Sequence, residues 1–181
     1  MTADDKGGLA VPLRIREAVR ALVVDPDRRV LLVRWEFPDR PELGYPAMSV
    51  WGTPGGGMEH GEDVEGALRR ELDEELGLVD PVIGPQIWER TYHIPFLDGM
   101  WDGQHDQFFL VEVAASFEPE PRLTREQLQA EHLMHVRWWT EDELVTFVPT
   151  DTEVFAPRRL PQLLRSLRVD GVPSNPLDVG P

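Results

Sequence analysis

Apolar residues occur along the chain in short runs and in alternation with polar residues, a pattern typical of β-strands in a partly buried sheet. Strands are expected over residues 15–24, 29–35, 49–51, 87–94, 107–114 and 135–139. The turn sequence Asp25-Pro26-Asp27 separates the first two segments, so we expect them to form a hairpin.

Other segments carry the pattern of helices. Residues 63–76 have helical periodicity, with acidic residues at the start and Gly77 as a stop signal. Residues 140–143 have the sequence of a capping box that opens a short helix, and residues 157–168 place leucines three, four and seven positions apart. Strands and helices mixed in this way indicate an α+β or layered α/β domain.

The length of 181 residues suits one domain with a single sizeable core. We expect this domain to span residues 13–169, after a loose leader over residues 1–12. Residues 170–181 are rich in Pro and Gly and are expected to form a disordered tail. Pro and Gly are also frequent over residues 37–47, where we expect a loop.

The composition is that of a globular protein, with 41% hydrophobic and 28% charged residues. The absence of cysteine excludes disulfides, thiolate metal sites and a cysteine nucleophile. The net charge of −15 repels a phosphate polymer, so we expect no nucleic-acid partner. The start of the chain lacks the apolar core of a secretory signal, and no apolar run is long enough to span a bilayer. A cytoplasmic location without membrane contact is therefore expected.

Three glutamates share one face of the helix predicted over residues 63–76. At about 100° per residue, Glu74 and Glu75 lie within about 60° of Glu71. Apolar side chains of the preceding turns, such as Val64 and Leu68, project at similar angles. The carboxylates therefore extend the inward face of the helix rather than its solvent face.

Carboxylates clustered on an inward face repel one another unless they are protonated or neutralised by a cation. Mg²⁺ takes oxygen ligands and is often shared between carboxylates and substrate phosphates. Gly55-Gly56-Gly57, just upstream, allow the backbone to approach a ligand closely. The alternative is a charged helix whose glutamates pair with Arg69 and Arg70.

The same segment resembles the Nudix box, a motif of nine specified positions over 23 residues. The positions are filled by Gly56, Glu62, Arg70, Glu71, Leu72, Glu74, Glu75, Gly77 and Leu78. The flanking pattern of strands and a final helix resembles the Nudix fold over about residues 14–168. The resemblance implies a mixed β-sheet sandwiched between helices, with the box as a loop–helix–loop.

The resemblance also implies a site. Glu71, Glu74 and Glu75 would bind Mg²⁺, or alternatively Mn²⁺, and the Gly55 carbonyl would add a ligand. Of the other box residues, Arg70 would join the catalytic set, while Gly56, Glu62 and Gly77 would brace the loop against the helix. Glu131, seven residues before Trp138, resembles a further glutamate that some Nudix enzymes recruit from a late loop, both for metal binding and for catalysis.

The implied reaction is attack of water on a phosphorus of a diphosphate, with Glu71 or Glu131 accepting the proton. The substrate would be small and nucleotide-like: a nucleoside triphosphate (oxidised forms included), ADP-ribose or a nucleotide sugar, or a dinucleoside polyphosphate. The alternative is a catalytically silent Nudix-fold sensor that binds a nucleotide. A homodimer is compatible with the family.

Substrate recognition is expected outside the box, where aromatic side chains are available for stacking on a base. The candidates are Trp51, next to the glycine loop, and Tyr92, Phe96 and Trp101 in the segment 92–106. Arg14, Arg16, Arg20 and Arg34 are candidates for phosphate contacts, with a solvated strand face as the alternative.

Overall fold

The computed structural model describes residues 12–41, 46–93 and 99–180. In chain order its elements are β1 (Ile15–Val24), β2 (Val30–Phe37), β3 (Met48–Gly52), α1 (Val64–Leu76), β4 (Ile83–Tyr92), β5 (Gly103–Glu112), α2 (Arg125–Ala130), β6 (Leu133–Trp139), α3 (Glu141–Thr146), β7 (Glu153–Ala156), α4 (Leu160–Asp170) and β8 (Leu177–Asp178).

The strands form one mixed sheet in the order β7-β3-β2-β1-β5-β4-β8, and β6 also pairs with β2. The parallel pair of β1 and β5 runs in register from Ile15↔Gly103 to Val24↔Glu112. In contrast, β1 meets β2 only at Val23 and Val24. The sheet therefore splits beyond this point, and one arm (β1, β5 and β4) diverges from the other (β2, β3 and β7).

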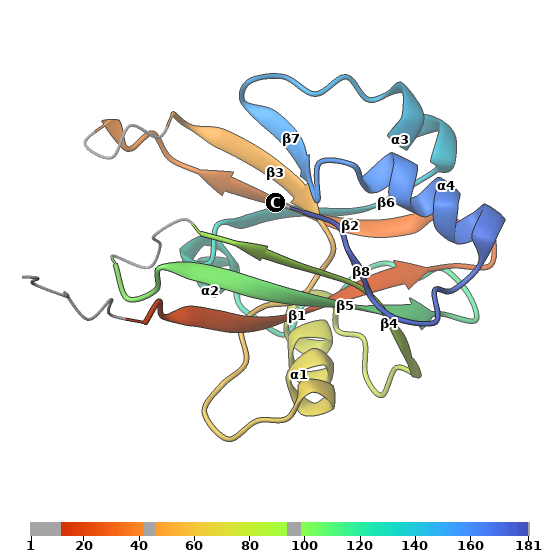
Figure 1. Ribbon diagram of the computed structural model, residues 1–181, viewed down its shortest axis with the longest axis horizontal. Coiled ribbons are helices and arrows are strands. Elements are labelled where there is room, and N and C mark those ends of the chain that lie inside the picture. The colour runs from red at the N-terminus through yellow and green to blue at the C-terminus, as the bar shows by residue number, and fades with distance from the viewer. Residues whose placement is uncertain (1–11, 42–45, 94–98, 181) are drawn as a thin grey trace, which may run out of the picture.

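Helices cover both faces of the sheet (Figure 1). Alternate residues of each strand supply the two cores, as the period of two requires. Val19, Ala21 and Val23 of β1 pack with Leu68 and Leu72 of α1. Leu22 belongs to the other core, together with the apolar residues of α3 and α4. No helix in the described part of the chain is long and apolar enough to cross a bilayer.

The expected α+β class with a mixed sheet between helices is confirmed, and so is each of the expected strands and helices, with shifted ends. The largest shifts concern β4 and β5, which begin at Ile83 and Gly103 rather than at residues 87 and 107. The hairpin of β1 and β2 forms, but its ladder is short because β1 pairs along its whole length with β5.

The structure corrects the expectation of a disordered tail over residues 170–181. Strand β8 pairs in parallel with β4 through Trp88↔Leu177, and Val179 is buried. Three elements, α2, β7 and β8, were not predicted, because each is too short to show a hydrophobic period. Of the expected leader, residues 1–11 lie outside the described part of the chain, as do residues 42–45 of the expected loop.

Candidate active site

Helix α1 begins and ends where its capping residues place it. The side chain of Asp63 accepts a hydrogen bond from the Gly66 N–H at 2.7 Å. Gly77 ends the helix in the left-handed region, at φ 68°. A Cβ there would lie 2.1 Å from the Glu120 carbonyl oxygen, so the position requires glycine for space as well. These local features fix where α1 begins and ends.

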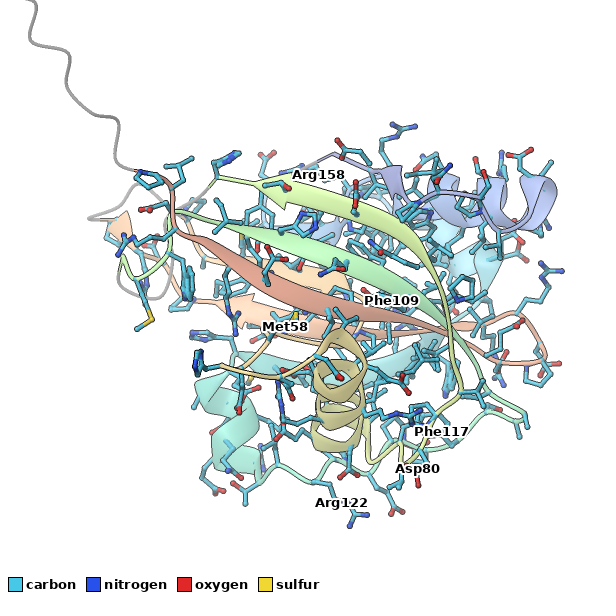
Figure 2. The ribbon with its side chains drawn as sticks, turned by 60° about the horizontal axis from the view of Figure 1, so that its bottom comes forward. Met58, Asp80, Phe109, Phe117, Arg122 and Arg158 are labelled. Atoms are coloured by element: carbon cyan, nitrogen blue, oxygen red, sulfur yellow. The ribbon has the colours of Figure 1, made fainter. Side chains whose placement is uncertain are left out.

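The glycine loop runs along β1 before it reaches α1. The Val19 N–H donates to the Gly56 carbonyl and the Ala21 N–H to the Pro54 carbonyl, both at 2.9 Å. Gly55 has a φ of 125°, and a Cβ there would lie 2.2 Å from the Val19 oxygen. Met58, the residue after the loop, packs against the core beside α1 (Figure 2). The loop is thereby held between β1 and the carboxylates of α1.

A cavity of about 830 Å³ opens beside this loop. The structure brings four of the predicted carboxylates to its wall: Glu71, Glu74, Glu75 and Glu131. Glu75 is only 2% exposed and Glu71 only 7%, whereas Glu131 lies exposed at the rim, at the C-terminal end of α2. The inward orientation predicted for the glutamates of α1 is confirmed for Glu71 and Glu75.

Arg70 connects the loop, the helix and the carboxylates. Its guanidinium donates to both oxygens of Glu62 at 3.0 Å and to the Gly57 carbonyl at 3.0 Å. It also donates to Glu71 at 2.8 Å and to Glu74 at 3.0 Å. The Glu62 contact is the largest cause of a raised pKa at Arg70, so this cation stays charged. Gly56 belongs to the same assembly, because a Cβ there would lie 2.5 Å from a Glu71 oxygen.

Glu75 is the most deeply buried of the four carboxylates. Its Oε2 accepts a hydrogen bond from the Gly55 N–H at 2.8 Å. Burial, reinforced by the nearby charge of Glu71, raises its pKa to about 8. Burial also raises the pKa of Glu71 and, together with Glu71 and Glu74, that of Glu131, although Glu131 retains solvent contact. The cluster thus favours protons or a cation.

The donor set fits a hard divalent cation, because it consists of carboxylate oxygens and the Gly55 carbonyl. Within the described ranges, no group of three or more His, Asp or Glu side chains already has a metal-binding arrangement. Arg70 holds one oxygen each of Glu71 and Glu74, and the Arg20 guanidinium donates to the Gly55 carbonyl. Metal binding therefore requires these side chains to reorient.

A second group of charges lines the same cavity, on the sheet. The pairing of β1 with β5 and of β5 with β4 places Gln104 beside Arg16 and Tyr92, and Asp106 beside Ala18 and Arg90. These side chains are cross-strand neighbours on the sheet. Asp106 is fully buried and accepts from Arg90 at 2.7 Å, from Arg20 at 3.1 Å and from Gln104 at 2.7 Å.

This group of side chains on the sheet carries more positive than negative charge. Burial alone would raise the pKa of Asp106, but Arg20 and Arg90 outweigh it and the pKa is lowered. Burial, together with the charge of Arg20, lowers the pKa of Arg16. The guanidinium groups of Arg16, Arg20 and Arg90 therefore line the cavity, whereas Asp106, which accepts hydrogen bonds from two of them, does not. Such a wall attracts an anion.

The aromatic candidates separate into different regions. Tyr92 lines the cavity, and its pKa is raised mainly by burial. Trp51 does not, because alternation along β3 turns its neighbour Val50 toward the cavity instead. The Trp51 and Trp139 ring centroids lie 5.0 Å apart, and the Trp51 indole N–H donates to Glu153. Its stacking on a substrate stays a prediction. Trp101 does not line the cavity either, and Phe96 lies outside the described residues.

The four arginines predicted to contact phosphate also lie in different places. Arg16 and Arg20 line the cavity, whereas Arg14 and Arg34 do not. Arg14 pairs with Asp102 at 2.9 Å on the exposed end of β1. Arg34 pairs with Glu36 and Glu153 on the other arm of the sheet.

The sequence analysis missed Arg90, which lines the cavity, and Asp106, the buried carboxylate that accepts hydrogen bonds from Arg20 and Arg90. Asp106 was assigned to the loop 92–106, although Gln104, Asp106 and Phe108 continue the alternation of the strand that follows. That alternation was the available signal. Trp35, Phe37 and Thr53 also line the cavity, and no sequence motif marks them.

Comparisons with known proteins agree with this geometry. A family model described as NUDIX domain matches residues 14–163. The chain is 35% identical over 108 residues to an RNA pyrophosphohydrolase of Gluconacetobacter diazotrophicus, a match that covers 55% of this chain and 64% of that protein. It is 29% identical over 115 residues to an RNA pyrophosphohydrolase of Wolbachia pipientis, covering 59% and 69%. The chain thus spans less than two thirds of the first of these relatives.

Solved structures of other proteins share the fold of this chain. The MutT protein from Methanosarcina mazei superposes with a TM-score of 0.59 over 89% of this chain and 98% of that one, at 15% identity. This likeness concerns the fold alone. The family model, however, covers most of the described chain, including the glycine loop, α1 and the cavity-lining strands. The chain therefore belongs to the NUDIX domain family.

Proposed function

We propose that the chain is a pyrophosphohydrolase that requires Mg²⁺, or alternatively Mn²⁺, and cleaves a diphosphate linkage in a small nucleotide-like substrate. The observation that carries the proposal is one cavity lined by two sets of opposite charge. Glu71, Glu74, Glu75 and Glu131 come from α1 and the end of α2, and Arg16, Arg20 and Arg90 come from β1 and β4. A diphosphate suits this arrangement, because the carboxylates would hold a cation that balances its charge, while the guanidinium groups would bind its oxygens.

When bound, the cation supplies polarisation of the phosphoryl oxygens and lowers the pKa of a coordinated water. Glu71, Glu74, Glu75 and the Gly55 carbonyl would hold it. The water oxygen forms a bond to one phosphorus, the bridging P–O bond breaks, and the departing phosphate carries the electron pair. The guanidinium groups of Arg16 and Arg20 bind the phosphate oxygens and balance their negative charge.

Glu131 is the carboxylate that we assign as proton acceptor in preference to Glu71. Glu71 is engaged by Arg70 at 2.8 Å, whereas Glu131 lies at the rim with solvent contact. Partial burial and the neighbouring glutamates raise the pKa of Glu131. A carboxylate with a raised pKa is a better proton acceptor. Glu131→Gln is expected to lower kcat about 10²-fold or more with little change in the Mg²⁺ concentration for half-maximal rate. An equal loss in metal affinity would assign Glu131 to metal binding instead.

The experiment that tests the proposal is a phosphate-release screen over a panel of nucleotides, with and without Mg²⁺. The panel includes nucleoside triphosphates and their oxidised forms, ADP-ribose, nucleotide sugars and dinucleoside polyphosphates. It also includes an RNA with a 5′ pyrophosphate linkage, because two relatives are named for that substrate. The net charge of −15 leads us to expect that small substrates are preferred to the RNA.

The variants are Glu75→Gln and, as a matched control on the same helix, Glu65→Gln, whose exposed side chain pairs with Arg69. We expect Glu75→Gln to lose turnover and Glu65→Gln to keep it. Full Mg²⁺-dependent turnover by Glu75→Gln would refute the site. Nucleotide binding by the wild type without turnover of any compound would favour the catalytically silent sensor.

A further inference from the structure

The three cavity-lining arginines of β1 and β4 differ in their distance from the glycine loop. The Arg20 guanidinium donates to the Gly55 carbonyl. The Arg16 guanidinium lies against Gly57, where a Cβ would be 2.1 Å from its Nη2. Both arginines come from β1, the strand to which the loop is hydrogen-bonded. They are therefore placed to contact an anion that is bound beside the glycine loop.

Arg90 comes from β4, two strands further across the sheet. The glycine loop meets β1 where Gly57 bridges to Ala18. Ala18 pairs with Asp106 of β5, and Asp106 pairs with Arg90. Because neighbouring strands lie about 5 Å apart, the backbone of Arg90 is about 15 Å from that of Gly57.

The Arg90 guanidinium is held over these outer strands. Its Nε donates to Asp106 at 2.7 Å, and Asp106 is fully buried. Its central carbon lies 5.2 Å from the ring centroid of Tyr92 on β4 and 5.7 Å from that of Phe108 on β5. A guanidinium that is fixed through Nε and packed against two rings loses little side-chain entropy when it binds a ligand.

The two terminal nitrogens of Arg90 are available to such a ligand. Neither Nη1 nor Nη2 has a hydrogen-bond acceptor among the described residues. Both keep accessible surface, since neither is one of the buried polar atoms that lack a partner. Arg90 lines the cavity, and the planar fork of a guanidinium matches two oxygens of a phosphate.

We propose that Arg90 is a subsite for a further phosphate group of the substrate, separate from the diphosphate bound beside the glycine loop. This inference rests on the proposed function for the place of the diphosphate, and it assigns Arg90 to a different group. The cavity of about 830 Å³ has room for both groups. The further phosphate belongs either to a longer phosphate chain or to another part of the molecule.

The test uses calorimetry in Mg²⁺ with probes that contain phosphate groups alone. A methylene-bridged diphosphate and the corresponding triphosphate are compared, because the methylene bridges prevent cleavage. Inorganic phosphate is then titrated into protein saturated with the diphosphate, which detects a separate group. We expect the wild type to bind the triphosphate at least about tenfold more tightly than the diphosphate, or to bind inorganic phosphate beside the diphosphate. Arg90→Met is expected to abolish whichever of these is observed.

Two further variants separate this role from a structural one. Arg14→Met is the matched control, because Arg14 also pairs with an aspartate, Asp102, but does not line the cavity. Arg90→Lys keeps a positive charge beside Asp106 without the planar fork, so it is expected to remain folded and still to lose the preference. The ratio of the two Kd values does not depend on the folded fraction, because both probes bind the same population.

Two results would overturn the inference. In the first, Arg90→Met weakens the diphosphate as much as the triphosphate, which would assign Arg90 to the diphosphate itself. In the second, the wild type neither prefers the triphosphate nor binds inorganic phosphate beside the diphosphate.

The outcome is separable from that of the proposed function. Binding of the further phosphate that depends on Arg90, in a protein that hydrolyses nothing, would support the subsite and refute the hydrolase. Mg²⁺-dependent hydrolysis that depends on Glu75, with both readouts unchanged in Arg90→Met, would refute the subsite alone.

Discussion

Glu75 and Asp106 are both buried carboxylates, yet their surroundings drive their pKa values in opposite directions. Asp106 lies between Arg20 and Arg90, and these two cations hold its pKa low despite burial. Burial, reinforced by the like charge of Glu71, raises the pKa of Glu75 to about 8, although the Gly55 N–H donates to this carboxyl. Neighbouring charge, not burial alone, decides the state of each group.

The raised pKa of Glu75 predicts a pH-dependent stability for the metal-free protein. Between about pH 4.5 and 8, the Glu75 carboxyl keeps its proton in the native state but has lost it in the unfolded chain. The free energy of unfolding therefore falls as pH rises through this window. Melting curves in a chelator at pH 5, 6, 7 and 8 measure it, and Mg²⁺ is expected to restore stability at pH 8. An identical pH slope in Glu75→Gln would contradict this origin.

Asp106 predicts a different behaviour on substitution. Asp106→Asn leaves Arg20 and Arg90 without their buried counter-charge and is expected to lower the free energy of unfolding by about 3–5 kcal/mol. The Tm is expected to fall by about 10 °C. Asp102→Asn, which breaks the exposed pair with Arg14, is the matched control and is expected to change the Tm little. Equal effects of the two variants would show that Asp106 has no special role.

At the scale of elements, α1 is the unit that carries the carboxylates to the cavity. Its ends are fixed by Asp63 and Gly77, and its inner face by Ala67, Leu68 and Leu72, all fully buried. The spacing of Glu71, Glu74 and Glu75 then follows from the helix itself. The direction from which they meet the cavity depends on the glycine loop, which β1 holds in place.

The cap of α1 gives a prediction at this scale. Asp63→Ala removes the acceptor for the Gly66 N–H and is expected to cost about 1 kcal/mol, or about 2–4 °C in Tm. Because α1 carries the carboxylates, the same variant is expected to bind Mg²⁺ more weakly, as followed by calorimetry. Asp63→Ser retains a capping oxygen and should behave like the wild type. A loss in Asp63→Ser equal to that in Asp63→Ala would exclude the cap as the cause.

At the scale of the whole molecule, the split of the sheet creates the cavity. Strands β1 and β2 pair at Val23 and Val24 and then diverge, and each arm contributes lining residues. The end of the chain stabilises one arm. Strand β8 extends the sheet beyond β4, and Val179 fills the core that α3 and α4 cover.

The ordered chain end predicts a contrast between two neighbouring residues. Val179 is 8% exposed, whereas Leu177 is 47% exposed. Val179→Asp places a charge in the core and is expected to lower the Tm and speed amide exchange over residues 177–180. Leu177→Asp is expected to do neither. Fast exchange of this segment in the wild type would show that β8 is not stably formed.

The carboxylate helix was predictable from the sequence, because everything that specifies it is local. Capping residues, apolar period and glutamate spacing all lie within residues 63–77, and helix geometry converts that spacing into one face. Strands β1 to β6 were predictable for the same reason, although their ends were not, since pairing with a neighbour extends β5 to Gly103.

The rest of the site was decided by tertiary structure. Arg20 and Asp106 meet although 86 residues separate them, because β1 and β5 pair in parallel, and no local pattern specifies that pairing. The same holds for Val50 and Trp51, neighbours in β3: the first lines the cavity and the second packs into the core. Which face of β3 looks onto a cavity depends on how the sheet splits, and long-range strand pairing alone sets that split.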